Sequence, residues 1–180
     1  MRKPIALWPG ILLLVFANSG WAQKPDKYYA EAYGLFGRRN SLPGTNALAL
    51  GGEFMYKGFA WGADVATTVG NQDDRITIGS VGGSYHVLCC RYKRKLEPFF
   101  GAGFSYLAGN INAHGRIFPN DPGNDRAGPY FNQGLTVWPT KHLGARFEVR
   151  EYRMFVSYGA LAQVIPGRGF VEVRIGVTVR

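Results

Sequence analysis

Apolar and polar residues alternate along the stretch "HLGARFEVREYR", from His142 to Arg153. One parity holds Leu143, Ala145, Phe147 and Val149, and the other holds Gly144, Arg146, Glu148 and Arg150. A period of two is that of a β-strand with two different faces. The pattern of this strand alone leaves open which face lies inside, because a soluble sheet also turns its charged face to water.

Segments with this period follow one another along the chain, each about ten residues long and ending in turn residues. We predict eight strands, at Tyr28–Phe36, Ala47–Tyr56, Phe59–Val69, Arg75–Leu88, Glu97–Ala108, Gly128–Trp138, Leu143–Arg153 and Gly169–Val179. The connections alternate between mostly short ones, such as "KG" and "PTKH", and mostly longer ones, with "CCRYKRK" as the exception. This alternation is typical of an antiparallel up-and-down meander.

The two parities of these strands differ in a way that separates inside from outside. In the last strand Val171, Val173, Ile175, Val177 and Val179 oppose Glu172, Arg174, Gly176, Thr178 and Arg180. Large apolar residues on one parity, with charges and very small residues on the other, describe a narrow polar lumen surrounded by lipid. A closed barrel also leaves no unpaired backbone in the hydrocarbon. The sequence therefore predicts an all-β, eight-stranded antiparallel up-and-down transmembrane β-barrel.

The charged parity predicts a buried network in the lumen, formed by Glu53, Asp64, Arg146, Glu148, Arg150, Glu172 and Arg174. Within it, Glu53 and Asp64 should lie beside arginines of the last two strands, because buried carboxylates need a partner. Opposite charges across a strand pair are favourable, so Glu148 should lie opposite Arg174 and Arg150 opposite Glu172. The same register sets Gly176 opposite Arg146, leaving room for the arginine side chain. It centres the connection of the last two strands on Leu161, within "YGALAQ".

The N-terminal segment of the chain suggests export. Residues 1–22 combine Arg2 and Lys3, the apolar run "IALWPGILLLVFA" and small residues before Gln23, which is typical of a cleaved signal peptide. The barrel domain is then 23–180. Removal of Arg2 and Lys3 lowers the net charge from +9 to +7. The remaining basic residues are dispersed, which argues against nucleic acid as a partner.

Candidate chemistry is sparse. The adjacent pair Cys89 and Cys90 makes no disulfide framework and has no metal-ligand spacing with the histidines, so we expect no metal and no cofactor. Lipid-modifying barrel enzymes need a His, a Ser and a carboxylate in contact. Ser84 and His86 share a parity, but no acid is evident beside them. We therefore expect a protein that is not an enzyme.

Aromatic residues gather near the short turns. Tyr56, Phe59 and Trp61 flank "KG", Trp138 precedes "PTKH", and Phe99 and Phe100 begin the fifth strand. Amphipathic rings collect at the headgroup level of a membrane. These residues are predicted to form an interfacial girdle.

The eight alternating strands, with glycine-rich segments such as "PFFGAGFSYLAG" and "SVGGSYHV", resemble the OmpA-like outer-membrane β-barrel family. The end "RIGVTVR" is similar to the assembly signal of such barrels, but it ends in Arg180 rather than an aromatic residue. The resemblance implies the outer membrane of a Gram-negative-type bacterium, a porin-like monomer surrounded by lipid, and insertion by the barrel-assembly machinery. A peptidoglycan-binding domain is not expected.

The function expected from these features is structural, or adhesive through surface loops such as "INAHGRIFPNDPGNDRAG", with the lumen plugged by charged side chains. The partner of the loops is not defined by the sequence. Two alternatives stay open: a lipid-modifying outer-membrane enzyme, and a soluble periplasmic lipocalin-like carrier.

Overall fold

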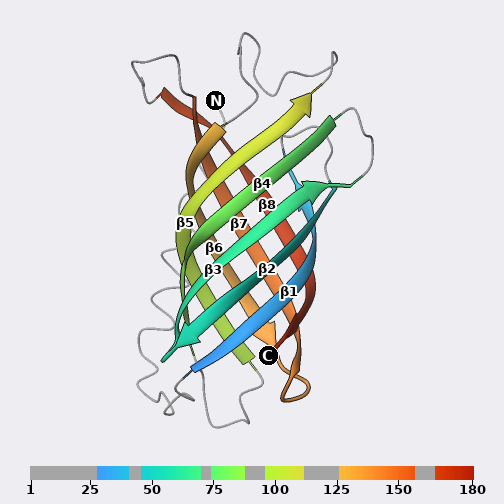
Figure 1. Ribbon diagram of the computed structural model, residues 1–180, viewed down its shortest axis with the longest axis vertical. Coiled ribbons are helices and arrows are strands. Elements are labelled where there is room, and N and C mark those ends of the chain that lie inside the picture. Colours follow the sequence, from blue (N-terminus) through green and yellow to red (C-terminus); the bar gives the residue numbers. More distant parts are fainter. Residues whose placement is uncertain (1–27, 41–45, 70–73, 88–95, 112–125, 157–164) are drawn as a thin grey trace.

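The computed structural model describes residues 28–40, 46–69, 74–87, 96–111, 126–156 and 165–180. They form eight strands: β1 (Tyr28–Arg39), β2 (Asn46–Tyr56), β3 (Phe59–Thr68), β4 (Asp74–His86), β5 (Leu96–Ile111), β6 (Arg126–Val137), β7 (Leu143–Val156) and β8 (Ile165–Val179). Consecutive strands pair antiparallel and β1 pairs with β8, which closes the barrel (Figure 1). The predicted eight-stranded antiparallel up-and-down barrel is confirmed. Within the described ranges, no helix is long and apolar enough to cross a membrane.

The barrel has one end with short connections, which we call the short-turn end and which lies at the bottom of Figure 1. Lys57 and Gly58 join β2 to β3 there, and residues 138–142 join β6 to β7. The other end, the loop end, is where several strands extend further than predicted, to Arg39, Ile111 and Val156. Three features of the sequence lie outside the described residues: the predicted signal peptide at 1–22, the Cys89–Cys90 pair and the "YGALAQ" segment.

The register of β7 against β8 agrees with the prediction from charge pairing. Glu148 lies opposite Arg174, Arg150 opposite Glu172, Arg146 opposite Gly176 and Val149 opposite Val173. The ladder continues regularly from Leu143 to Arg153 and has an irregularity between Arg153 and Phe155. A slip of one residue would have turned the lumen charges of the slipped strand toward the outside.

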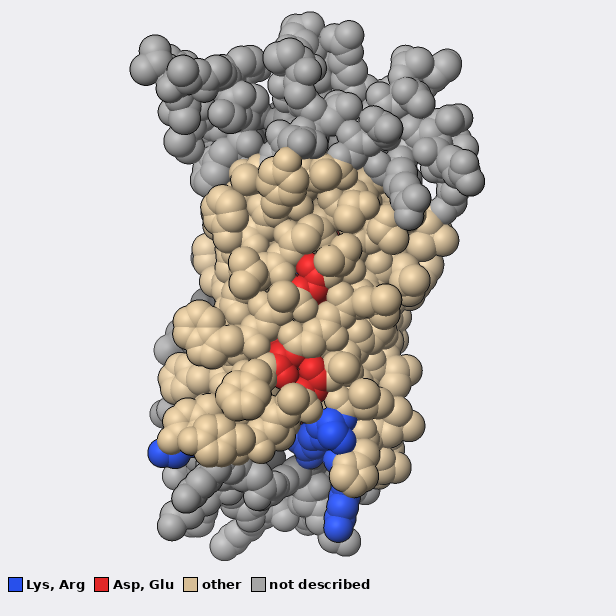
Figure 2. Space-filling model, viewed as in Figure 1, with Lys and Arg blue, Asp and Glu red and all other residues tan. Residues whose placement is uncertain are grey.

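The outer surface of the barrel is an apolar belt. Exposed large side chains alternate along the strands, including Leu50 (62%), Trp61 (73%), Ile175 (61%) and Val177 (53%). Figure 2 shows this belt in tan, with two small red areas. Apart from Glu151, every acidic residue whose side chain is described is buried. The charged parity is therefore the inside of the barrel.

The predicted aromatic girdle is only partly correct. Tyr56, Phe59, Trp61 and Phe100 are exposed as expected, but Phe99 and Trp138 are each 2% exposed and lie in the lumen. Phe99 stacks on His86 at 5.1 Å between ring centroids, and the Trp138 indole N–H donates to Glu97 at 3.0 Å. Strand parity decides this placement, because residues 97 and 99 of β5 share the inward face.

The lumen is not polar along its whole length. Near the loop end the inward residues form an apolar cluster of Ile76, Ile78, Leu107, Tyr130, Tyr152 and Phe170. A second group, Tyr33, Leu35, Ala49 and Ala66, covers the inner wall of β1 to β3. The charged residues thus share the lumen with apolar side chains.

Candidate functional site: a charge network in the lumen

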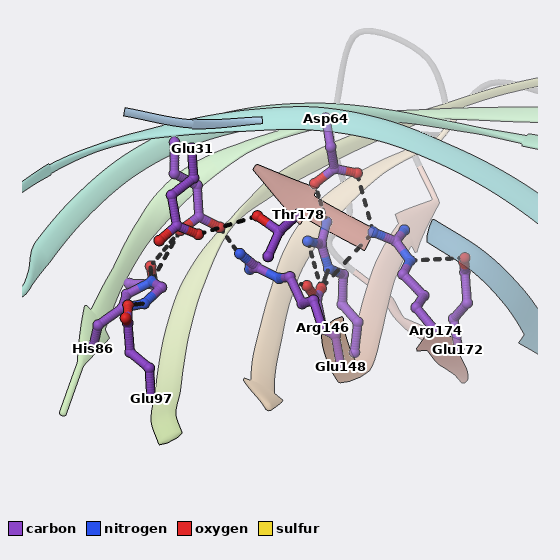
Figure 3. A network of polar contacts seen from close by, with 12 residues as sticks. Glu31, Asp64, His86, Glu97, Arg146, Glu148, Glu172, Arg174 and Thr178 are labelled. Carbon is purple, nitrogen blue, oxygen red and sulfur yellow. Dashed lines mark hydrogen bonds and ion pairs between the residues drawn. The ribbon is translucent and has the colours of Figure 1, made fainter. Parts of the chain in front are cut away.

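Glu148 on β7 lies at the centre of the lumen network, among three arginines (Figure 3). Its carboxylate is 2.6 Å from Arg150 Nη2, 3.2 Å from Arg146 Nη2 and 3.8 Å from Arg174 Nη1. Glu148 and Arg174 are 0% exposed, as is Arg146, and Arg150 is 1% exposed. Strand periodicity brings Arg146, Glu148 and Arg150 to the same face of β7, two residues apart.

Asp64 on β3 connects the network to the opposite wall. Its carboxylate accepts from Arg150 Nη1 at 2.6 Å and from Arg174 Nη1 at 3.2 Å. Arg174 also donates through Nε to Glu172 at 2.8 Å and through Nη2 to the Tyr152 hydroxyl. Asp64 thereby ties β3 to β7 and β8, which are not its neighbours in the sheet.

Toward the loop end the network finishes at Arg39 on β1. Its Nε donates to Glu172 at 2.9 Å, and its Nη1 donates to the Thr68 hydroxyl at 3.2 Å. Both Arg39 and Glu172 have side chains that are 0% exposed. This pair joins β1 to β8 inside the barrel, at the seam where the first and last strands meet.

Glu53 on β2 links the network to a second cluster near the short-turn end. Its Oε1 accepts from Arg146 Nη2 at 2.6 Å, and its Oε2 is 2.9 Å from His86 Nε2. His86 Nδ1 faces Glu97 Oε1 at 2.8 Å. We call this group, with Tyr29, Ser84, Trp138 and Arg180, the histidine cluster.

Both ring nitrogens of His86 face carboxylates, so the imidazolium form can donate to both at once. A neutral ring would leave a nitrogen lone pair facing carboxylate oxygen. The charge balance agrees with this protonation. The buried carboxylates are Glu31, Glu53, Asp64, Glu97, Glu148 and Glu172, and the arginines on the inner wall are Arg39, Arg146, Arg150, Arg174 and Arg180. With His86 charged, the formal positive and negative groups are equal in number, but among the described residues no cation is paired with Glu31, whose Oε1 has no hydrogen-bond partner.

Aromatic rings support the buried guanidinium groups. Arg146 Cζ lies 4.4 Å from the ring centroid of Tyr33 and 4.1 Å from that of Phe99. Arg150 Cζ lies 4.4 Å from the ring centroid of Tyr130. Within the described part of the chain, Arg146 Nε and Nη1 have no hydrogen-bond partner. The cation–π contacts therefore compensate part of the cost of burying this charge.

The structure places all seven predicted network residues inside the barrel. The predicted ion pair of Glu148 with Arg174 is present at 3.8 Å, but among the described residues the predicted pair of Arg150 with Glu172 is not, although these two are opposite in register. Each instead pairs along its own strand, Arg150 with Glu148 and Glu172 with Arg174. The strands of a barrel are tilted, so two side chains that are opposite in register do not point directly at one another. Each can therefore pair instead with a residue on its own strand or across the lumen.

The steric reason for Gly176 also differs from the prediction. A Cβ at this position would collide with the backbone of β1 at Gly34 and Leu35. Arg146 is not among the nearest atoms. Gly176 is therefore required by the close approach of β1 to β8, and not by the volume of the arginine.

Sequence reasoning missed the histidine cluster. The expectation that Ser84 and His86 have no acidic partner is wrong, because Glu97 contacts His86 directly and Glu53 contacts both. Parity along β5, with Glu97 and Phe99 on one face, was the signal that could have placed Glu97 in the lumen. Its pairing with His86 depends on the register between β4 and β5, which sets His86 opposite Phe99.

The described residues include no group of three or more His, Cys, Asp or Glu side chains arranged to hold a metal ion. The carboxylates of the network are instead occupied by guanidinium and imidazole nitrogens. The arrangement can neutralise charge and hold seven strands together, through residues of β1, β2, β3, β4, β5, β7 and β8.

Comparison with solved structures identifies the fold. A designed protein described as "De novo design of transmembrane beta-barrels" has a TM-score of 0.53 and 15% identity, covering 87% of this chain and 98% of that chain. Neisserial surface protein A (NspA) has a TM-score of 0.51 and 14% identity, covering 84% of this chain and 96% of that chain. The chain therefore has the fold of the eight-stranded transmembrane β-barrels.

A third solved structure has a more distant likeness. It is Ail, the attachment invasion locus protein of Yersinia pestis, in complex with the heparin analogue sucrose octasulfate. The TM-score is 0.43 at 10% identity, covering 84% of this chain and 96% of that chain, too low to support a conclusion. No protein-family model matches the chain, and no curated protein matches its sequence.

Proposed function

We propose that the chain is a non-enzymatic outer-membrane protein, whose barrel is a rigid support for its surface loops. The observation that carries this proposal is the separation of the two barrel faces. The outer face is an apolar belt of the kind that contacts lipid, and the inner face holds a charge-balanced network. The similarity to OmpA-like barrels in strand patterning supports the same location and a role in interaction or adhesion.

The filled lumen supports a closed barrel rather than a pore. Glu148, Arg146 and Arg174 block the middle of the lumen, and the apolar cluster around Tyr152 and Phe170 fills it nearer the loop end. Eight strands enclose only enough space for side chains. We therefore assign the charge network a structural role in plugging and stiffening the barrel.

Conductance is the direct test of this assignment. The purified chain, inserted into a planar lipid bilayer, should produce no stable single-channel steps, and it should migrate differently on gels before and after boiling. A large porin inserted in parallel is the positive control. Regular conductance steps from the wild-type barrel would refute the plugged lumen, and the lack of any heat-modifiable form would count against the folded membrane barrel.

A lipid-modifying hydrolase is the second candidate, because Ser84 Oγ lies 2.9 Å from His86 Nε2 and His86 Nδ1 lies 2.8 Å from Glu97. These distances are those of a nucleophile, base and acid in contact. The position of Glu53 argues against a hydrolase, because Glu53 Oε2 is also 2.9 Å from His86 Nε2. An imidazolium held between two carboxylates cannot accept the proton of a serine hydroxyl.

We therefore expect Ser84→Ala to leave membrane lipids unchanged. Mass spectra of lipid A and phospholipids from cells that express the wild type, Ser84→Ala or no protein should coincide. A deacylated species that appears with the wild type and disappears with Ser84→Ala would establish the hydrolase instead.

The soluble carrier is the least favoured candidate. A carrier in water would have to expose Trp61 and Ile175, at 73% and 61%, within a continuous apolar belt. Soluble monomers rarely expose apolar patches of this extent. The lumen also holds charged groups where a carrier of apolar ligands needs an apolar cavity.

A further inference from the structure

Positive side chains gather at the short-turn end of the barrel. Lys57 and Lys141 are exposed there, and Arg180 is partly exposed. On the face drawn in Figure 2, the blue atoms lie in the lower part of the tan surface, the central ones directly below the lower red area. The described carboxylates nearest this end, Glu31 and Glu97, are each 3% exposed. The surface at this end is therefore positive, without exposed acidic side chains among the described residues to neutralise it.

The surface at the loop end differs in this respect. Arg153 is exposed there and forms an ion pair with Glu151 two residues away on β7. Arg38 is also exposed near this end. One of the two exposed arginines described at the loop end is therefore paired with an acid, whereas no ion pair joins Lys57 or Lys141 to an acidic side chain among the described residues.

Lys57 occupies its turn at a conformational cost. Its φ is 50°, and that of the following Gly58 is 88°, so both central residues of the β2–β3 hairpin have positive φ, as in a type I′ turn. Asn-Gly is the favoured pair in this turn, because asparagine tolerates the left-handed region better than lysine does. A residue held in a sparsely populated conformation points to a role of its side chain outside the turn.

The neighbours of Lys57 place it at the level of lipid headgroups. Tyr56 and Tyr28 are exposed and stack at 4.7 Å between ring centroids, and Lys57 Nζ lies 5.0 Å from the Tyr56 ring centroid. Phe59, on the other side of the turn, is 61% exposed. Exposed tyrosines beside a lysine at the edge of an apolar belt are typical of the membrane interface, where the ammonium group meets phosphate.

We propose that Lys57 and Lys141 bind the phosphate groups of anionic phospholipids in the leaflet at the short-turn end. This inference rests on the proposed membrane location. Lys57 contributes from the β2–β3 turn and Lys141 from the β6–β7 connection, so the basic surface has contributions from two separate turns. The lipid partner is chosen over a soluble acidic protein because Lys57 directly borders the aromatic edge of the lipid-facing belt.

Lipid retention tests the proposal. The full-length mature chain is reconstituted in vesicles of equal phosphatidylcholine and phosphatidylglycerol, extracted in mild detergent, and its bound lipids are quantified by mass spectrometry. The wild type should retain more phosphatidylglycerol than phosphatidylcholine, by roughly fivefold for each contributing charge. About 1 M salt in the extraction should remove the preference, because it screens exposed charges.

Variants at one position separate charge from folding. Lys57→Asn removes the charge but suits the positive φ, so it should reduce the phosphatidylglycerol preference about fivefold while the unfolding midpoint stays equal or rises. Lys57→Arg should keep the preference. Lys141→Gln should lower it by a similar factor. Arg153→Gln is the matched control, because the charge of this exposed arginine is already paired with Glu151 and its loss should leave retention unchanged.

The outcomes also distinguish this proposal from the one on which it rests. The lipid site alone would be overturned if the wild type inserted into both the mixed and the pure phosphatidylcholine vesicles but retained the two lipids equally. An unchanged preference in the Lys57→Asn and Lys141→Gln double variant would do the same. Failure of the wild type to insert into vesicles of either composition would overturn the membrane location itself.

Discussion

Replacing Glu148 by leucine should lower the free energy of unfolding of the barrel by about 3–5 kcal/mol. Glu148 is 0% exposed and its carboxylate lies 2.6 Å from Arg150 and 3.2 Å from Arg146, with Arg174 at 3.8 Å. Removal of this one anion leaves three guanidinium groups close together in a region without bulk water. The repulsion and the lost hydrogen bonds act in the same direction, so this is the largest single effect we expect.

The measurement is a reversible denaturant titration of the protein inserted in lipid vesicles, followed by tryptophan fluorescence. Glu148→Gln keeps the shape and one acceptor, and should be destabilised less than Glu148→Leu. The matched control is Glu151→Leu on the same strand, where the side chain of the ion-paired Glu151 is 43% exposed. Its loss should cost at most about 1 kcal/mol. Equal effects at positions 148 and 151 would contradict a buried network centred on Glu148.

The fold could be predicted because a strand carries its information in alternate residues. Valine at 173 and arginine at 174 assign opposite faces from the sequence alone. The register of β7 against β8 was also predictable, because one alignment sets Glu148 opposite Arg174 and Arg150 opposite Glu172. These conclusions need only neighbouring strands and the rule that like charges avoid one another.

Strand parity predicted that Glu53 and Asp64 lie beside arginines of the last two strands, and the structure agrees. Which arginine each carboxylate contacts could not be predicted, because it depends on distances across the barrel. Asp64 on β3 pairs with Arg150 and Arg174, residues 86 and 110 positions away in the chain. Which inward residues meet in this way depends on strand tilt and stagger, which no local pattern of residues encodes. The same reason explains why the contact of His86 with Glu53 was missed, since β2 and β4 are not neighbours in the sheet.

Aromatic residues misled the sequence interpretation for a related reason. Phe99 and Phe100 are adjacent and chemically alike, yet Phe99 is 2% and Phe100 is 42% exposed. A strand turns them to opposite faces, so nearness to a turn does not by itself place a ring in a girdle. Inside the lumen Phe99 lies under the Arg146 guanidinium at 4.1 Å, where its ring face supports a buried cation.

The second large effect is expected on the outer face, at Ile175. It is 61% exposed, and its register partners Phe36 and Phe147 on the two neighbouring strands are 49% and 44% exposed. An arginine there must leave its charge among apolar side chains and lipid tails, or extend a long way toward the interface. Ile175→Arg should therefore destabilise the inserted barrel by about 2–4 kcal/mol.

Val179 provides the matched comparison, because it lies on the same face of the same strand and is 47% exposed. It is the last residue of β8, at the short-turn end, where an arginine can reach headgroups and water. Val179→Arg should therefore cost only about 0–1 kcal/mol, and Val177→Arg should fall between the two. Unfolding titrations in vesicles would give the three values directly. Equal and small losses of stability at 175, 177 and 179 would mean that this face contacts water. The assignment of inside and outside would then fail, because the same alternation places every lumen residue of β8.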